Sequence, residues 1–155
     1  MKRPLFRRKN PKAIDDLLAN TVRLAHKKVQ VGITDDGEQH NEAGMTVKEL
    51  AIIHEFGSIK AKIPERSFIR ASMNLHRRKY RLMLAKGAPK ILIGRASPTS
   101  LLNDVGAQAA QDMRQYIRKG SNFEPLAPMT VAKKGHSRPL LDTRQMERAI
   151  NHKVE

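Results

Sequence analysis

The spacing of apolar residues predicts a helix and then a strand in the first part of the chain. Residues 29–33, Val-Gln-Val-Gly-Ile, alternate as in a half-buried strand. Before them, Asn10 is suited to cap a helix and Pro11 to occupy its first turn, where a missing N–H costs nothing. The apolar residues of this helix, expected over residues 11–27, recur every three or four positions and form one stripe: Ile14, Leu17, Leu18, Val22 and Ala25.

Two further helices are expected on either side of an arm. Thr46 and Glu49 have the spacing of a capping box, and Gly57 is suited to end the short helix that follows. A longer helix begins near Ser67, and we expect the Gly-Ala-Pro sequence at 87–89 to break it. One line of this helix comprises Phe68, Ser72, Leu75, Lys79 and Leu82.

Residues 57–66 are expected to form an extended arm, either a hairpin or an edge strand. Ile59, Ala61 and Ile63 alternate with polar or charged residues, which gives the arm one apolar edge and one basic edge. Because the chain has few aromatic side chains to cover that edge, we expect it to lie across a neighbouring subunit. Phe56 and Phe68 stand at the two ends of the arm, and the interface is predicted at Phe56, Ile59, Ile63 and Phe68. Ordinary core packing is the alternative for both phenylalanines.

The remainder of the chain predicts one more long helix and a final strand. Residues 97–99, Ser-Pro-Thr, open a helix that Gly120 ends. A short helical turn is expected at 130–134, before Gly135, and a capping box at 142–145 precedes one or two turns. A strand follows at 149–154. The fold class is therefore α+β: a small antiparallel or mixed sheet packed with two or three longer helices, in one domain of residues 11–155.

Composition limits the chemistry of this domain. The chain has 155 residues, of which 39% are hydrophobic and 4% aromatic, and it contains no Cys and no Trp. Disulfides and thiolate chemistry are thus excluded. No apolar run approaches the roughly 20 residues that span a bilayer, so we expect a soluble protein with no membrane partner.

The net charge of +15 predicts an acidic partner. Basic residues gather in an N-terminal arm, residues 1–10, which includes Arg7 and Arg8, and again at Arg77, Arg78 and Arg81. These arginines are expected to contact either an acidic protein surface or the backbone of packaged DNA. We favour the protein surface, because the chain has no aromatic pair for base stacking and no helix-turn-helix signal.

No motif in the sequence indicates catalysis. His54-Glu55 begins a zinc-protease signature, but position 58 is Ser where the second His would be needed. Asp35-Asp36-Gly37-Glu38 lacks the alternating oxygen ligands and the late Glu of a calcium loop. Phosphate-binding loops and nucleophile elbows are likewise absent from the sequence. We therefore expect no enzymatic activity, no catalytic residue, no cofactor and no metal.

Three stretches together resemble the tail-completion, or head–tail joining, proteins of tailed bacteriophages. Residues 45–57 end in His-Glu-Phe-Gly, as in that family, and residues 63–70, Ile-Pro-Glu-Arg-Ser-Phe-Ile-Arg, are similar to its Ile-Pro-x-Arg-Pro-Phe-Leu-Arg. Residues 125–143 resemble its Pro-Leu-x-Pro-x-Thr-x-x-x-Lys-Gly segment and the Pro-Leu-x-Asp-Thr-Gly that follows. The chain departs from the pattern at Ser67, where Pro is usual, and at Arg144, where Gly is usual.

The resemblance implies a structural protein of the virion neck, assembled in the host cytoplasm. It implies a ring of copies, expected to be six-fold, at the head-proximal end of the tail. The tail terminator or tail tube protein would lie below the ring, and head-completion or connector proteins above it. The basic arm at 1–10 lies outside the resemblance. The alternative function is a sequence-independent DNA-binding protein that uses the basic helix and this arm.

Overall fold

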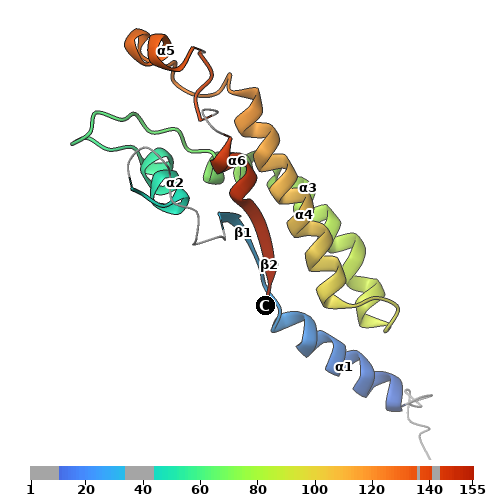
Figure 1. The fold of residues 1–155 in the computed structure, drawn as a ribbon. Coiled ribbons are helices and arrows are strands. Elements are labelled where there is room, and N and C mark those ends of the chain that lie inside the picture. Colours follow the sequence, from blue (N-terminus) through green and yellow to red (C-terminus); the bar gives the residue numbers. More distant parts are fainter. Residues whose placement is uncertain (1–10, 34–43, 136, 141–143) are drawn as a thin grey trace, which may run out of the picture.

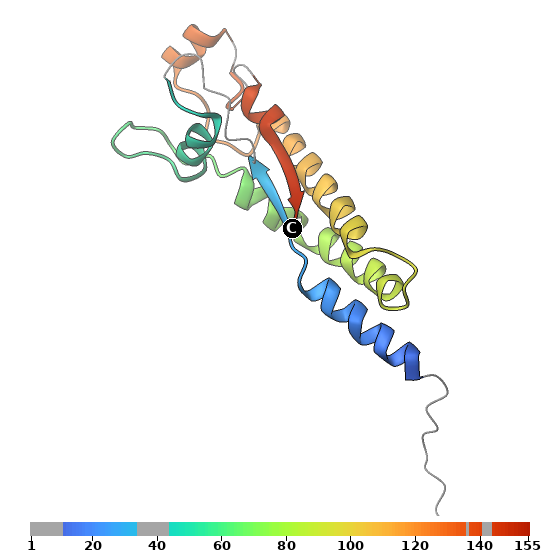
Figure 2. The same ribbon diagram turned by 60° about the horizontal axis from the view of Figure 1, so that its bottom comes forward.

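The fold is a long helical hairpin with a two-stranded sheet along it, in a computed structural model that describes residues 11–33, 44–135, 137–140 and 144–155 (Figure 1). Helices α3 and α4 form the hairpin, and α1 extends beyond its closed end (Figures 1 and 2). In chain order the elements are α1 (Pro11–Ala25), β1 (Val29–Ile33), α2 (Val47–Phe56), α3 (Ile69–Leu92), α4 (Pro98–Lys119), α5 (Pro128–Lys134), α6 (Gln145–Ala149) and β2 (Ile150–Val154). The predicted α+β class is confirmed.

The sheet lies against α4 and joins the two ends of the described chain. Strand β1 pairs antiparallel with β2, in the register that sets Val29 opposite Val154 and Ile33 opposite Ile150. The sheet packs closely on α4 at Gly106, where an added Cβ would lie 2.6 Å from His152 Cδ2 and 2.7 Å from Val29 Cγ2. A side chain at position 106 would therefore push the sheet away from the helix.

A buried carboxylate joins α3 to α4. Asp112 of α4 is 4% exposed and accepts hydrogen bonds from Lys79 Nζ at 2.8 Å and Tyr80 Oη at 3.0 Å, both from α3. Gln108 Nε2 donates to its second oxygen. Burial opposes ionisation of Asp112, but the hydrogen bonds from Lys79 and Tyr80 outweigh it and hold its pKa below the usual value. The charge is thus satisfied inside the hairpin.

The structure corrects the predicted break in α3. The helix continues through Gly87 and Pro89 to Leu92, and Ile91 in its last turn is 1% exposed. A Cβ at position 87 would lie 2.4 Å from Leu101 Cδ1, so this glycine lets α4 pack closely against α3. Burial of the last turn outweighs the hydrogen bond that Pro89 cannot donate.

The apolar stripe predicted on α1 is exposed, and the line predicted on α3 is only partly buried. Leu75 and Leu82 of α3 are 65% and 51% exposed, whereas Ser72 of the same predicted line is fully buried. On α1, the side chains of Ile14, Leu17, Leu18 and Val22 are all exposed. Both helices therefore carry an apolar face that the described part of the subunit does not cover.

Most of the predicted helix and strand ends are confirmed. Thr46 and Glu49 form both hydrogen bonds of the capping box, and Gly120 ends α4 with φ 63°. The strand expected at 149–154 is β2, and α5 ends at Gly135 as predicted. Asn10, the turn at 35–37 and the first residues of the 142–145 capping box lie outside the described residues. No helix in the described ranges is both long and apolar enough to cross a membrane.

We predict that Gly106→Ala destabilises the fold by about 1–3 kcal/mol, because the methyl group would overlap two strand side chains. The free-energy cost of this overlap should exceed the roughly 1 kcal/mol by which alanine stabilises a helix relative to glycine. Gly87→Ala is the comparison: its methyl group would overlap the terminal methyl groups of Leu101, which can rotate aside, so a smaller loss is expected there. Urea unfolding followed by circular dichroism measures both. Equal or greater stability of Gly106→Ala would contradict the described contact between α4 and the sheet.

Candidate assembly surface around Glu55

A single carboxylate from α2 caps the start of α3. Glu55 is 4% exposed, and its Oε2 accepts the backbone N–H groups of Phe68 at 2.8 Å and Ile69 at 2.9 Å. Its Oε1 accepts the N–H of Arg70 at 3.0 Å and the hydroxyl of Ser67 at 2.8 Å. The first N–H groups of a helix have no partner within the helix, and residue 68 supplies no side-chain cap of its own. Glu55 therefore provides the cap from another helix.

Arg70 completes the ionic partners of Glu55. Its Nε donates to Glu55 Oε1 at 3.0 Å, and its Nη2 donates to the Glu55 carbonyl and to Glu65 Oε1, each at 2.9 Å. The guanidinium also lies over the Phe56 ring, 4.6 Å from its centroid. Burial opposes ionisation of Glu55, but the hydrogen bonds from Arg70, Ile69 and Ser67 outweigh it and lower its pKa.

Between Glu55 and its partners the chain forms a closed hairpin. The N–H of Ser58 donates to the Ile63 carbonyl at 2.8 Å, and the N–H of Ile63 donates back at 2.9 Å. At the base, the N–H of Arg66 donates to the His54 carbonyl at 2.7 Å. Gly57 has φ 71°, and a Cβ there would lie 2.9 Å from Glu65 N, so only glycine fits without strain. The expected extended arm at 57–66 is thus a self-paired hairpin, hereafter the 58–63 hairpin.

The three stretches that resemble tail-completion proteins lie together around Glu55 and the start of α3. Arg66 is buried, and its guanidinium donates to the carbonyls of Glu124 and Pro125, where the third stretch begins. Val47, Phe68 and Leu140, one from each stretch, belong to one hydrophobic core cluster together with Met113 of α4. Residues far apart in sequence therefore form one connected unit.

The structure places the predicted interface residues in different environments. Ile59 at the tip of the 58–63 hairpin is 100% exposed and Phe56 is 61% exposed, whereas Ile63 is half-buried. Phe68 is 0% exposed in the core, so its assignment to the subunit interface is wrong. It is buried because the Glu55 cap holds the start of α3 against α4. Ile52, one turn before Phe56, adds a further exposed apolar side chain at 53%.

The predicted basic contact residues lie on the outer side of the helical hairpin. Arg77, Arg78 and Arg81 are exposed and line a shallow depression on α3 with Leu75 and Leu82. Within the described residues their side chains form no ion pair or hydrogen bond. Arg7 and Arg8 lie outside the described residues.

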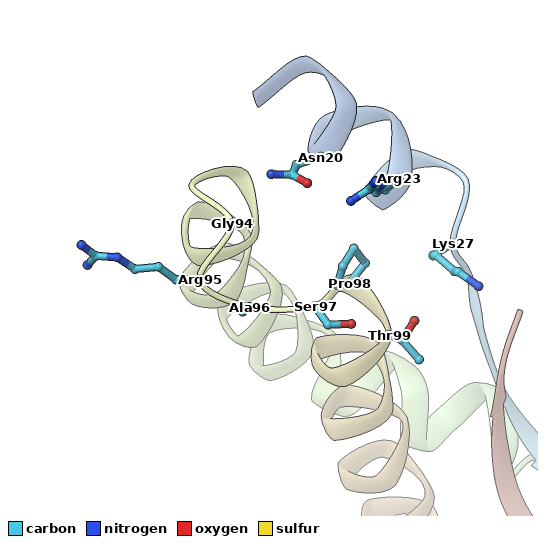
Figure 3. A pocket seen from close by; sticks show the side chains of 9 residues that line it. All are labelled: Asn20, Arg23, Lys27, Gly94, Arg95, Ala96, Ser97, Pro98 and Thr99. Atoms are coloured by element: carbon cyan, nitrogen blue, oxygen red, sulfur yellow. The ribbon is translucent and has the colours of Figure 1, made fainter. Parts of the chain in front are cut away.

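A second basic depression lies where α1 meets the loop between α3 and α4 (Figure 3). It is lined by Arg23, Lys27 and Arg95 and by the first residues of α4, with no carboxylate among its lining residues. Figure 3 shows Arg95 pointing away from it. The depression suits an anion, but Arg95 does not face into it.

Sequence reasoning missed the part that Glu55, Arg66 and Arg70 play. All three belong to the stretches quoted for the resemblance, which was the one signal available; apolar spacing does not reveal a buried ion pair. Within the described ranges, no group of three or more His, Cys, Asp or Glu side chains is arranged to hold a metal ion. Compared with protein-family models, curated proteins and solved structures, the chain matches none.

We predict that Glu55→Gln lowers the free energy of unfolding by about 2–3 kcal/mol, because a neutral amide replaces the charged carboxylate as the hydrogen-bond acceptor. Each carboxylate oxygen accepts at least two hydrogen bonds, and the amide nitrogen of glutamine cannot accept any. Urea unfolding measures the loss.

The matched control is Glu65→Gln, which removes only the exposed ion pair with the same arginine. It should cost clearly less than Glu55→Gln. Equal losses for the two variants would contradict the capping role of Glu55.

Proposed function

We propose that this chain is a structural virion protein that completes the head-proximal end of a bacteriophage tail and helps join the tail to the head. The main support is the connection between the three stretches that resemble tail-completion proteins: Glu55, Arg66 and Arg70 join them by hydrogen bonds. This unit presents a closed hairpin whose tip carries the fully exposed apolar side chain of Ile59. An exposed apolar tip on an ordered hairpin is suited to contact another protein.

In this proposal, copies of the chain assemble as a ring, expected to be six-fold, through the 58–63 hairpin. Ile59 inserts into the neighbouring subunit, with Phe56 at the edge of the contact and Ile63 supporting the hairpin. Burying Ile59 would contribute roughly 1.5–3 kcal/mol per contact before ordering costs. The ring faces the tail terminator or tail tube protein on one side and head-completion or connector proteins on the other. In this proposal the ring assembles in the host cytoplasm, becomes part of the virion neck and catalyses no reaction.

Sequence-independent DNA binding is the second candidate function. The net charge of +15, the exposed Arg77, Arg78 and Arg81, and the basic depression in Figure 3 favour it. Such binding would weaken steeply as salt is raised, because phosphate contacts release counterions. The exposed Leu75 and Leu82, which flank the arginines, favour a protein partner instead, since a DNA backbone offers no apolar surface to cover them.

We predict that Ile59→Ser abolishes ring formation by the recombinant protein while changing the free energy of unfolding by less than about 0.5 kcal/mol. The side chain is fully exposed in the subunit, so its loss should affect only contacts between copies. Negative-stain electron microscopy and sedimentation velocity report the rings, and urea unfolding reports the stability.

Lys60→Ser is the matched control, because it changes the next exposed residue of the same hairpin. It should leave the rings intact. Rings formed by Ile59→Ser at the wild-type concentration would show that the interface lies elsewhere. A wild-type protein that stays monomeric at every concentration would contradict ring assembly itself.

A further inference from the structure

The closed end of the α3–α4 hairpin carries positive charge that no carboxylate balances. Between Glu65 and Asp104 the sequence contains nine Lys and Arg residues and no Asp or Glu. This stretch includes all of α3, the loop after it and the first residues of α4. Its last three cations, Lys86, Lys90 and Arg95, are exposed, and their side chains form no ion pair within the described residues. A surface with this imbalance attracts a polyanion.

Two cations from α1 are added at the depression of Figure 3. Arg23 of α1 and Lys27, two residues after its end, line the depression together with the first residues of α4. Both side chains are exposed and make no ion pair or hydrogen bond within the described residues. The carboxylate of Glu155 already pairs with Lys28 at 3.0 Å and Lys153 at 3.2 Å. The two cations at the depression are therefore free to bind an external anion.

The other side of the depression supplies neutral hydrogen-bond donors. Ser97 and Thr99 line it, and the Ser97 side chain makes no capping hydrogen bond to α4. The N–H groups of Thr99 and Ser100 also have no partner within the described residues. Arg and Lys side chains, hydroxyl groups and N–H groups at helix starts are the donors with which proteins hold the phosphates of nucleic acids. The depression, about 620 Å³ in volume, combines all of them.

The cations beyond the depression favour a polynucleotide over a single phosphate compound. Arg95 points away from the depression in Figure 3, and Lys86 and Lys90 lie one turn, roughly 6 Å, apart on α3. One phosphate in the depression would leave these three side chains without an anion. A nucleic-acid strand places further phosphates near them, because it carries one charge per roughly 3.4 Å of helix axis.

We propose that this depression binds a backbone phosphate of a polynucleotide. Arg23 and Lys27 hold the phosphate from the α1 side, and the donors at the start of α4 hold it from the other side. Arg95, Lys90 and Lys86 contact neighbouring phosphates. All of these contacts are to the backbone, so binding does not depend on base sequence.

The inference goes beyond the proposed ring assembly and does not rest on it. The 58–63 hairpin lies just before the first turn of α3, whereas the depression lies after its last turn (Figure 1). The 24 residues of α3 separate the two surfaces, roughly 36 Å at the rise of an α-helix. One subunit can thus contact a neighbouring copy and a polynucleotide at the same time.

Anisotropy titrations with two labelled DNA duplexes of unrelated sequence, repeated over a series of salt concentrations, test the site. The variant carries Arg23→Gln and Lys27→Gln, and its fold is checked by circular dichroism. It should bind both duplexes roughly tenfold more weakly than wild type at low salt. The slope of log affinity against log salt should become shallower by about one, because one phosphate contact is lost.

The matched control carries Lys12→Gln and Lys119→Gln, which removes the same charge from exposed positions at the far ends of α1 and α4. It should change the affinity by less than about twofold at low salt. Equal weakening by the two variants would show that net charge alone attracts DNA and would overturn the site. Discrimination between the two duplexes by wild type would contradict contacts to the backbone alone.

Two further titrations identify the anion. Added inorganic phosphate should shift the amide NMR signals of Thr99 and Ser100 in wild type and not in the Arg23→Gln, Lys27→Gln variant, with chloride of equal ionic strength as the reference. Phosphate shifts without any duplex binding would assign the site to free phosphate compounds and overturn the polynucleotide. Binding of polyglutamate as tight as that of DNA, and lost in the same variant, would assign it to an acidic protein. A monomeric wild type would contradict ring assembly and leave these measurements on single subunits intact.

Discussion

The buried Glu55 carboxylate is the interaction on which the arrangement of this end of the molecule depends. It belongs to α2, yet its partners are the first N–H groups of α3, the Ser67 hydroxyl and the Arg70 guanidinium. An unpaired carboxylate at this depth would be strongly unfavourable, so α2 and α3 must hold this geometry together. The segment between the two helices therefore forms a hairpin that backbone hydrogen bonds close at both its base and its tip. The position of Phe68 in the core and of Ile59 in solvent both follow from this constraint.

Much of the secondary structure could be predicted from local signals in the sequence. The capping box at Thr46 and Glu49, the glycine after α4 and the alternation of β1 each depend on neighbouring residues alone. The failures have tertiary causes. A glycine followed by a proline usually ends a helix. Here α3 continues through Gly87 and Pro89, because Gly87 packs closely against Leu101 and Ile91 in the last turn is buried. No periodicity indicates that Glu55 pairs with residues twelve to fifteen positions away. The only sequence signal for the site was therefore the resemblance of these stretches to tail-completion proteins.

The exposed apolar residues lie in two separate parts of the molecule. Phe56 and Ile59 lie around the 58–63 hairpin, whereas a second group of exposed apolar side chains lies on α1, the helix that extends past the closed end of the long helical hairpin (Figure 1). Exposed apolar side chains at two sites suit a subunit that contacts two neighbours at once. A ring gives every copy two such neighbours.

The pKa of Glu55 tests the central interaction most directly, because burial and hydrogen bonding shift it in opposite directions. Burial alone would raise it, whereas the N–H groups and Arg70 lower it. A lowered pKa means that the carboxylate stabilises the fold above its unfolded pKa, and that this stabilisation is lost as the pH falls through the folded value. Carbon-13 NMR titration of the Glu55 carboxyl group measures the shift. We predict a pKa below the ordinary value of 4.5; a value above 4.5 would show a buried carboxyl group without its donors and would contradict the account.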